Sequence, residues 1–310
     1  MNKLFILMLA LLLLISLPVT GCQSLVKGSG NLETKDYDFT DFLRVEIDGP
    51  FEVNIAYADS YQVSVTADDN MLEKIEISNE DNTLKIGLQS ARYSGLLRIQ
   101  YVDASAQVTI SMPRLRSLFL SGMAKGTCSD FDSRASADFN IAGASSLDIQ
   151  GISVGDVNFN VTSASKVTGE IIAGDAEFNE AGASSIQLIG SANIIVCGAK
   201  DTSQLELDDF IVDIADVRLR GASIGTVNVN GKLHADLSEG SILSYLGEPI
   251  MGNIKISGGS AMNRKSPVTS TPTSTSAAPT PSFNWPLIGG IIGGVVVVGL
   301  IIFFLVRRRD

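Results

Sequence analysis

A unit of about 19–20 residues repeats along the middle of the chain. The stretch AGASSLDIQG at 142–151 returns in nearly the same letters as AGASSIQLIG at 181–190. Equivalent corners, 18 to 21 residues apart, fall at Gly122, Gly143, Ser163, Gly182, Asp201, Gly221, Glu239 and Gly258. A near-constant period of this length is typical of a solenoid, in which each unit buries its apolar face only by stacking on its neighbours.

Apolar and polar residues alternate on both sides of each corner. Two residues before the corner, the side chain is apolar in every unit except at Glu180. Three residues before the corner, it is polar in most units. Four residues before the corner, every unit carries an apolar side chain: Leu118, Phe139, Phe159, Phe178, Cys197, Val217, Ala235 and Ile254. A period of two is that of a strand with one buried face. Since stacking pairs each strand with its copy on the next coil, about 4.8 Å away, the pattern predicts an all-β parallel β-helix.

A serine stands two residues after each corner from the second unit on, at Ser145, Ser165, Ser184, Ser203, Ser223, Ser241 and Ser260. Stacked coils would bring these hydroxyls into a ladder. We expect the ladder to be structural, because buried hydroxyls need hydrogen bonds with one another or with the backbone.

Residues 38–118 lack this corner but alternate strongly, as in FEVNIA at 51–56. Turn-forming clusters such as EDN at 80–82 separate the alternating runs. The pattern fits either further coils of the same stack or a hairpin cap at its end.

Both ends of the chain carry membrane signals. Residues 1–22 have a basic start, an apolar stretch and small residues before Cys22, which is the layout of an export signal. Val19 to Cys22 resembles a bacterial lipoprotein box, which predicts a lipidated Cys22; ordinary cleavage that leaves a free thiol is the alternative. Residues 287–306 carry no charge and would span about 30 Å as a helix, the thickness of a bilayer core. Three arginines follow, which predicts a cytoplasmic tail at 307–310.

The segments between these signals complete the expected organisation. Residues 23–37 are expected to be a linker, 38–264 the β-helical domain, and 265–286 an extended stalk rich in Ser, Thr and Pro. Two overlapping G-x-x-x-G pairs on the membrane helix suggest a homodimer face, formed by Gly289, Gly290, Gly293 and Gly294. The predicted location is the cell membrane, single-pass, with the main domain outside.

Several of these stretches together resemble one known family. They are GSGNLETKDYDF at 28–39, FLRVEIDGPFEVNIA at 42–56, the repeated GAS corners, and LSEGSILSYLGEP with ISGGSAMNR near the end. In this combination the chain resembles the auto-transporter adhesin head family, also called the GIN domain, over about residues 28–264. The resemblance implies a right-handed β-helix and a role in adhesion at the cell surface. The chain departs from the family corner at Asp201 and Glu239, where Gly is usual, and at Gly225, where an aliphatic residue is expected.

The residues give little indication of catalysis. The single histidine, His234, lies in an outward column and is expected to be a solvated surface residue. Cys128 and Cys197 fall in inward columns three coils apart, too far for a disulfide. The acidic stretch with Glu206, Asp208, Asp209, Asp213 and Asp216 has no calcium-loop spacing, so a solvated face is favoured over a weak Ca²⁺ site. Basic residues are sparse through the coils, and their order suggests no cluster. We expect no cofactor and no enzyme activity.

The formal net charge of −11 disfavours nucleic acid as a partner, because like charges repel. The expected function is that of a non-enzymatic, membrane-anchored surface protein that binds an extracellular protein or glycan. The outward column of Asn140, Asn160 and Asn179 could face this ligand, because stacked amides repeat at a regular spacing. Two alternatives stay open: a structural or envelope-stress module acting at its own membrane, and, less favoured, a glycan-active enzyme.

Overall fold

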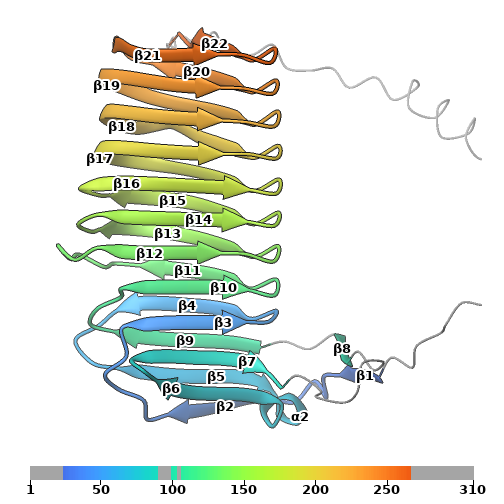
Figure 1. The fold of residues 1–310 in the computed structure, drawn as a ribbon. Helices are drawn as coiled ribbons and strands as arrows, with labels where there is room; N and C mark the ends of the chain where they lie inside the picture. Colours follow the sequence, from blue (N-terminus) through green and yellow to red (C-terminus); the bar gives the residue numbers. More distant parts are fainter. Residues whose placement is uncertain (1–23, 90–98, 103–105, 267–310) are drawn as a thin grey trace, which may run out of the picture. The chain divides into compact units, whose positions relative to one another are not determined.

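The strands on the two sides of each corner form two parallel ladders (Figure 1). The computed structural model describes residues 24–89, 99–102 and 106–266, all within one unit of the chain. The predicted signal with Cys22, the stalk beyond residue 266, the helix at 287–306 with its four glycines, and the tail at 307–310 lie outside the described residues. Within the described ranges, no helix has both the length and the apolar character needed to cross a bilayer.

The first ladder consists of the strands that precede the corners. It runs through β10 (Ser117–Ser121), β12 (Ala137–Ile141), β14 (Val157–Thr162), β16 (Asp175–Ala181) and the second halves of β17 (Ser185–Ala199), β18 (Gln204–Leu219) and β19 (Ile224–Leu237), and ends at β21 (Ile250–Ile256).

The second ladder consists of the strands that follow the corners. It runs through β11 (Lys125–Ser129), β13 (Ser146–Ser153), β15 (Lys166–Ile172), the first halves of β17, β18 and β19, and then β20 (Ile242–Leu246) and β22 (Ala261–Arg264). The predicted β-solenoid is therefore confirmed, while its right-handed sense stays a prediction.

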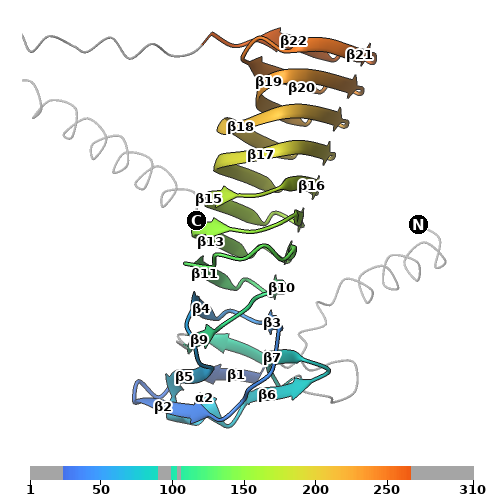
Figure 2. The same cartoon turned by 90° about the vertical axis from the view of Figure 1, so that its left-hand side faces the viewer.

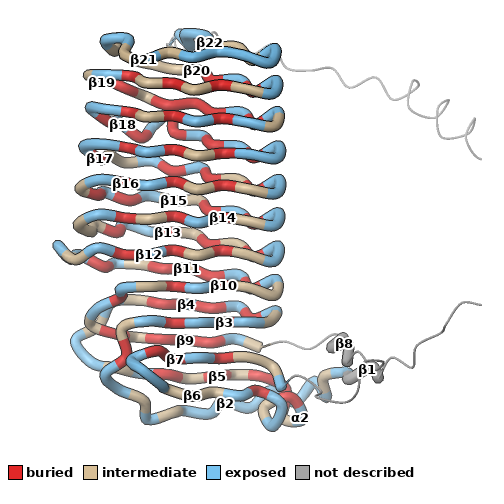
Figure 3. Tube along the Cα trace, in the orientation of Figure 1, coloured by how far each residue is buried: buried red, intermediate tan, exposed pale blue. Residues whose placement is uncertain are grey.

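The register of the first ladder follows the repeat. Leu118 pairs with Phe139, Phe139 with Phe159, and Phe159 with Phe178, and the same column continues to Ile254. Every residue of this column except Ile254 is buried. Figure 3 shows the resulting alternation of buried and exposed positions along each coil.

Phenylalanine rings stack along the axis of the solenoid. Phe139 and Phe159 lie 5.1 Å apart and nearly parallel, and Phe159 and Phe178 lie 5.5 Å apart. Phe210 then meets Phe178 edge-on at 6.0 Å. Burying one such side chain contributes about 1.5–3 kcal/mol, so the stack joins neighbouring coils through their interior.

The corners turn through two successive residues in the left-handed region. Gly143 has a φ of 66° and Ala144 a φ of 61°. A side chain at Gly143 would bring its Cβ within 2.9 Å of the Gly122 backbone nitrogen on the preceding coil. Glycine is therefore required at this corner both by the backbone conformation and by the close approach of the coils.

The serine ladder is structural, as expected. The hydroxyl of Ser203 donates to the carbonyl of Lys200 at 2.7 Å and lies 3.4 Å from the hydroxyl of Ser184. Ser145 accepts a hydrogen bond from the amide of Ala124 on the preceding coil, at 3.0 Å. These bonds satisfy buried polar groups where the backbone turns.

Residues 38–118 combine both of the arrangements that the sequence allowed. β3 (Arg44–Asp48) and β4 (Glu52–Tyr57) form a coil directly against β10 and β11. The chain then turns back through β5 (Gln62–Asp68), α2 (Asp69–Leu72), β6 (Ile75–Glu80), β7 (Thr83–Leu88) and β9 (Ala106–Met112). β7 and β9 extend the two ladders in parallel, whereas β5 and β6 add antiparallel strands outside them.

The antiparallel strands cap the end of the stack. Figures 1 and 2 place β2, β5, β6 and α2 at the end opposite β21 and β22. The predicted linker at 23–37 is corrected here, because β2 (Leu32–Tyr37) pairs antiparallel with β5, outside the ladder. β1 (Ser24–Lys27) forms a separate parallel pair with β8 (Ile99–Val102). Almost every residue of β2 is exposed, so the strand carries no alternation of apolar residues that the sequence could reveal.

Candidate functional site

The three predicted asparagines form one outward row on the first ladder. Asn140 on β12 pairs in register with Asn160 on β14, which pairs with Asn179 on β16. The amide nitrogen of Asn160 lies 3.4 Å from the side-chain oxygen of Asn140. The amide nitrogen of Asn179 instead donates to Glu177 at 2.9 Å. The row is thus an ordered set of donors and acceptors on rigid strands.

The row opens into a groove where its next member has no side chain. Gly198 follows Asn179 in register, and Arg218 follows Gly198. The groove has a volume of about 400 Å³ and is lined by Asn160, Thr162, Asn179, Glu180, Ala181, Gly198, Ala199, Lys200, Arg218 and Arg220. Small residues lie at its middle, amides at one end and cations at the other.

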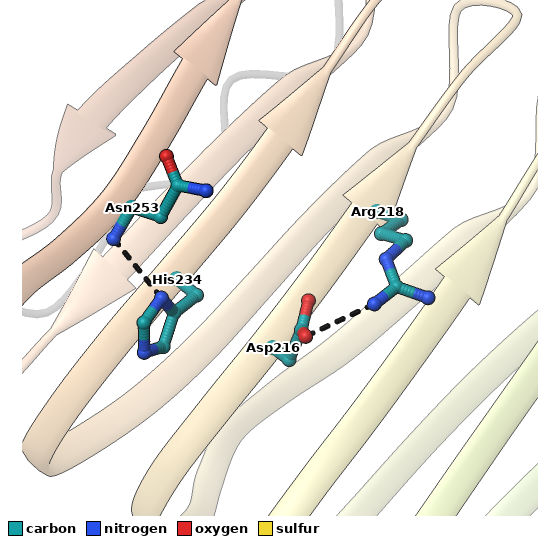
Figure 4. A network of polar contacts seen from close by, with 4 residues as sticks. All are labelled: Asp216, Arg218, His234 and Asn253. Atoms are coloured by element: carbon teal, nitrogen blue, oxygen red, sulfur yellow. Dashed lines mark hydrogen bonds and ion pairs between the residues drawn. The ribbon is translucent and has the colours of Figure 1, made fainter.

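The structure gathers Lys200, Arg218 and Arg220 at this groove, so the expectation of no basic cluster is wrong. The guanidinium of Arg218 pairs with the carboxylate of Asp216 at 3.1 Å (Figure 4). This pair is exposed and therefore worth little energetically. Lys200 and Arg220 form no ion pair with any residue that the structure describes. The signal in the sequence was their position: they stand directly before two successive corners.

A second groove on the same ladder is acidic. It has a volume of about 320 Å³, and Asp138, Asp156, Asp175 and Glu177 are among the residues that line it. Asp138 and Glu177 lie in one column on either side of Asn158. Among the described residues, no group of three acidic, histidine or cysteine side chains is arranged to hold a metal ion. The outward face therefore carries opposite charges in neighbouring grooves.

Glu180 contributes no charge to the basic groove at neutral pH. Its side chain is 3% exposed, and neither carboxylate oxygen has a hydrogen-bond partner within the described part of the chain. Burial raises the pKa of Glu180 to about 9, because the charged form loses its hydration. Glu180 occupies an apolar column, in which Val161 lies on the preceding coil and the short side chain of Ala199 on the next coil.

The remaining polar candidates have structural roles or lie on the surface. His234 lies in the expected outward column, in register with Asp216, but it is half-buried and hydrogen-bonded (Figure 4). Cys128 and Cys197 are free and buried, and burial raises the pKa of both thiols. In the acidic stretch at 206–216, the carboxylate of Asp208 pairs with Lys265.

Comparison with known proteins supports the same architecture. The family model described as "Putative auto-transporter adhesin, head GIN domain" matches residues 41–249. A crystal structure titled as a putative adhesin from Parabacteroides merdae ATCC 43184 has a TM-score of 0.70 at 18% identity, covering 78% of this chain and 100% of that one.

Two structures from Parabacteroides distasonis ATCC 8503 are also similar. One, titled as a putative adhesin, has a TM-score of 0.71 at 19% identity; it covers 78% of this chain and 100% of its own. The other, titled as a putative lipid binding protein, has a TM-score of 0.70 at 16% identity with the same coverage. At these identities the likeness concerns the fold. No curated protein matches the chain in sequence.

Proposed function

The chain belongs to the auto-transporter adhesin head (GIN) domain family, and on this premise we propose that it is a non-enzymatic surface protein whose first ladder binds an extracellular partner. The observation that carries the proposal is the row of Asn140, Asn160 and Asn179, held in register on consecutive coils. Amide groups repeated at about the strand spacing of 4.8 Å suit a partner with a repeating structure, such as an envelope polymer.

A binding role agrees better with the polar groups than a catalytic one. The ring of His234 accepts a hydrogen bond from the backbone, and among the described residues it is paired with no nucleophile. Both carboxylate oxygens of Glu180 are buried and have no hydrogen-bond partner among the residues that the structure describes, so a substrate has no access to this carboxyl group. The groove offers amides and cations that can hold a ligand, but no acid and base facing each other across it.

Membrane anchoring forms part of the proposal and rests on the sequence. The lipoprotein-box-like end at Cys22 and the uncharged segment at 287–306 would hold the domain at the outer side of the cell membrane. The Ser/Thr/Pro-rich residues at 265–286 would serve as a stalk. Mass spectrometry of the mature protein checks the N-terminal anchor, since a lipidated Cys22 carries the mass of its acyl chains.

The test of binding uses the purified full chain in detergent micelles. We expect saturable binding to intact cells or to isolated envelope polymers, and loss of that binding after heat unfolding. The double variant N160A/N179A should weaken binding, whereas Q187A, an exposed amide of the second ladder, should not. Saturable binding that N160A/N179A leaves unchanged would contradict the role of this face. Absence of saturable binding to any surface would overturn the adhesin-like function and favour a module that acts at its own membrane.

A further inference from the structure

We propose that the basic groove binds an acidic glycan, with an anionic group on Lys200 and Arg220 and sugar hydroxyls on the amides of Asn160 and Asn179. This inference rests on the proposed binding function and adds the chemical class of the ligand. The glycan would carry isolated acidic groups between neutral sugars. A uronic acid carboxylate and a phosphodiester offer the same anionic chemistry.

Two cations lie at equivalent positions on neighbouring coils. Ala199 pairs in register with Leu219, and the backbone N–H of Arg220 donates to the carbonyl of Ala199 at 2.9 Å. Lys200 and Arg220 therefore follow one another in the same column, one strand spacing apart. Like charges opposite each other on adjacent coils repel, and neither cation forms an ion pair with an acidic residue among those that the structure describes. An anion bound between the two would remove this repulsion.

The groove has empty space beside these cations. A Cβ added at Gly198 would lie 3.4 Å from the side-chain oxygen of Asn179, an ordinary contact, and Gly198 does not have a left-handed backbone. An alanine is thus compatible with this position, yet the row is interrupted here by a glycine. The gap exposes the floor of the groove between Asn179 and Arg218. It gives a sugar ring room to lie against the strands.

Carboxylates on the same face limit how much negative charge the ligand can carry. Asp216 already engages Arg218, and the acidic groove with Asp138 and Glu177 lies along the same face. Glu177 also accepts the hydrogen bond from Asn179. A dense polyanion that followed the asparagine row would meet these carboxylates. A glycan with spaced acidic groups can place one at Lys200 and Arg220 and keep neutral sugars along the amides.

The test measures binding of the full chain, in detergent micelles, to fluorescently labelled oligosaccharides. The probes are a hyaluronan oligosaccharide, in which uronic acids alternate with neutral sugars, its carboxyl-reduced form, and a phosphate oligomer in which phosphodiesters join neutral disaccharides. We expect an acidic probe to bind and the carboxyl-reduced probe to bind about tenfold or more weakly, the loss of a charge-assisted contact. Binding of hyaluronan or of the phosphate oligomer alone identifies the source of the anion.

Matched variants locate the site. K200A/R220A should lower the affinity for the acidic probe about tenfold or more, while R134A/K166A, which removes the same charges from exposed positions elsewhere, should not. G198L should block the groove without changing any charge, and an unchanged circular dichroism spectrum would show that it folds. Equal loss in both double variants would mean attraction by net charge only and would overturn the site.

The outcomes separate this inference from the proposed function. Equal affinity for the hyaluronan oligosaccharide and for its carboxyl-reduced form would assign the groove to neutral glycans and reject an acidic ligand. Saturable binding to cells without binding of any acidic probe would reject the ligand class and leave the adhesin-like function standing. Absence of both would remove the proposed function as well.

Discussion

The Nδ1 atom of His234 accepts a hydrogen bond from the backbone N–H of Asn253, at 3.0 Å. The bond closes an irregularity in the last coil, where β19 and β21 shift register between Leu233 and Ala235. Two residues of β21, Gly252 and Asn253, there oppose the single residue His234, which is the arrangement of a β-bulge. The imidazole also lies over Gly252, since a Cβ at that glycine would come within 2.6 Å of the ring.

Replacing His234 by alanine should loosen the final coil. The N–H of Asn253 then loses its acceptor, and we expect the free energy of unfolding to fall by about 0.5–1.5 kcal/mol. Hydrogen exchange, measured on the Asn253 amide, should become faster, because the bond no longer protects it. His234→Phe serves as the control, since it keeps a ring over Gly252 without the acceptor. If exchange at Asn253 stays slow in both variants, the histidine does not hold the bulge.

Glu180 should make stability fall as pH rises. Below its ordinary pKa of 4.5 the carboxyl is protonated in both the folded and the unfolded chain. In this range the burial of Glu180 therefore does not lower the free energy of unfolding as pH changes. Between 4.5 and about 9 only the folded chain keeps the proton. The free energy of unfolding should therefore fall by about 1.4 kcal/mol per pH unit from this group alone.

Glu180→Gln should remove this dependence, since glutamine does not titrate. Denaturant unfolding between pH 5 and 8 measures it. The stability of the variant relative to the original chain should rise with pH across this range. Glu170→Gln, at an exposed carboxylate of β15, provides the control and should leave the original slope. Parallel pH curves for Glu180→Gln and the original chain would mean that Glu180 does not stay protonated on folding.

The serine ladder should contribute measurably to stability. Ser203 is fully buried, and its hydroxyl satisfies the carbonyl of Lys200 at the corner. Ser203→Ala leaves this carbonyl without that donor, so we expect a loss of about 1–2 kcal/mol in the free energy of unfolding. Ser185→Ala, at a partly exposed serine of the preceding coil, should change stability by less than about 0.5 kcal/mol. Equal effects from the two substitutions would rule out a structural role for the hydroxyl ladder.

The corner glycine should tolerate no side chain, whereas the groove glycine should. Gly143→Ala forces a left-handed alanine and a Cβ 2.9 Å from the Gly122 nitrogen, so we expect a loss of about 1–3 kcal/mol. Gly198→Ala meets only the Asn179 oxygen at 3.4 Å, and alanine suits a strand better than glycine. Its thermal midpoint should be equal or higher. A comparable loss of stability in both variants would show that the left-handed backbone at Gly143 does not decide the cost of adding a side chain.

The repeat alone was sufficient to derive the coil and its register. Side chains of the strands that face the interior of the solenoid are apolar on nearly every coil, because each coil packs directly on the next. The column from Leu118 to Ile254 could therefore be aligned by spacing, and the strands pair along it. The same reasoning placed Cys128 and Cys197 in the core. Glu180 was visible as the one exception in its column, although its neutral state depends on burial.

Features that lack a buried apolar face were decided by the tertiary structure. β2 pairs through its backbone while its side chains stay exposed, so its residues carry no period that marks a strand. The turn of the chain from β4 into the cap, before it resumes at β10, depends on long-range pairing that local patterns do not specify.

The basic groove and the bulge at His234 are likewise formed by residues that are distant in the sequence but close together in the fold. Lys200 and Arg220 stand a full coil apart in the sequence and become neighbours only when the coils stack. The bond from Asn253 to His234 likewise requires a shift in register, which the regular period conceals. The sequence thus determined which side of each strand in the regular coils is buried, because every coil needs apolar side chains on that side. The folded stack determined which exposed residues meet, because no apolar pattern constrains them.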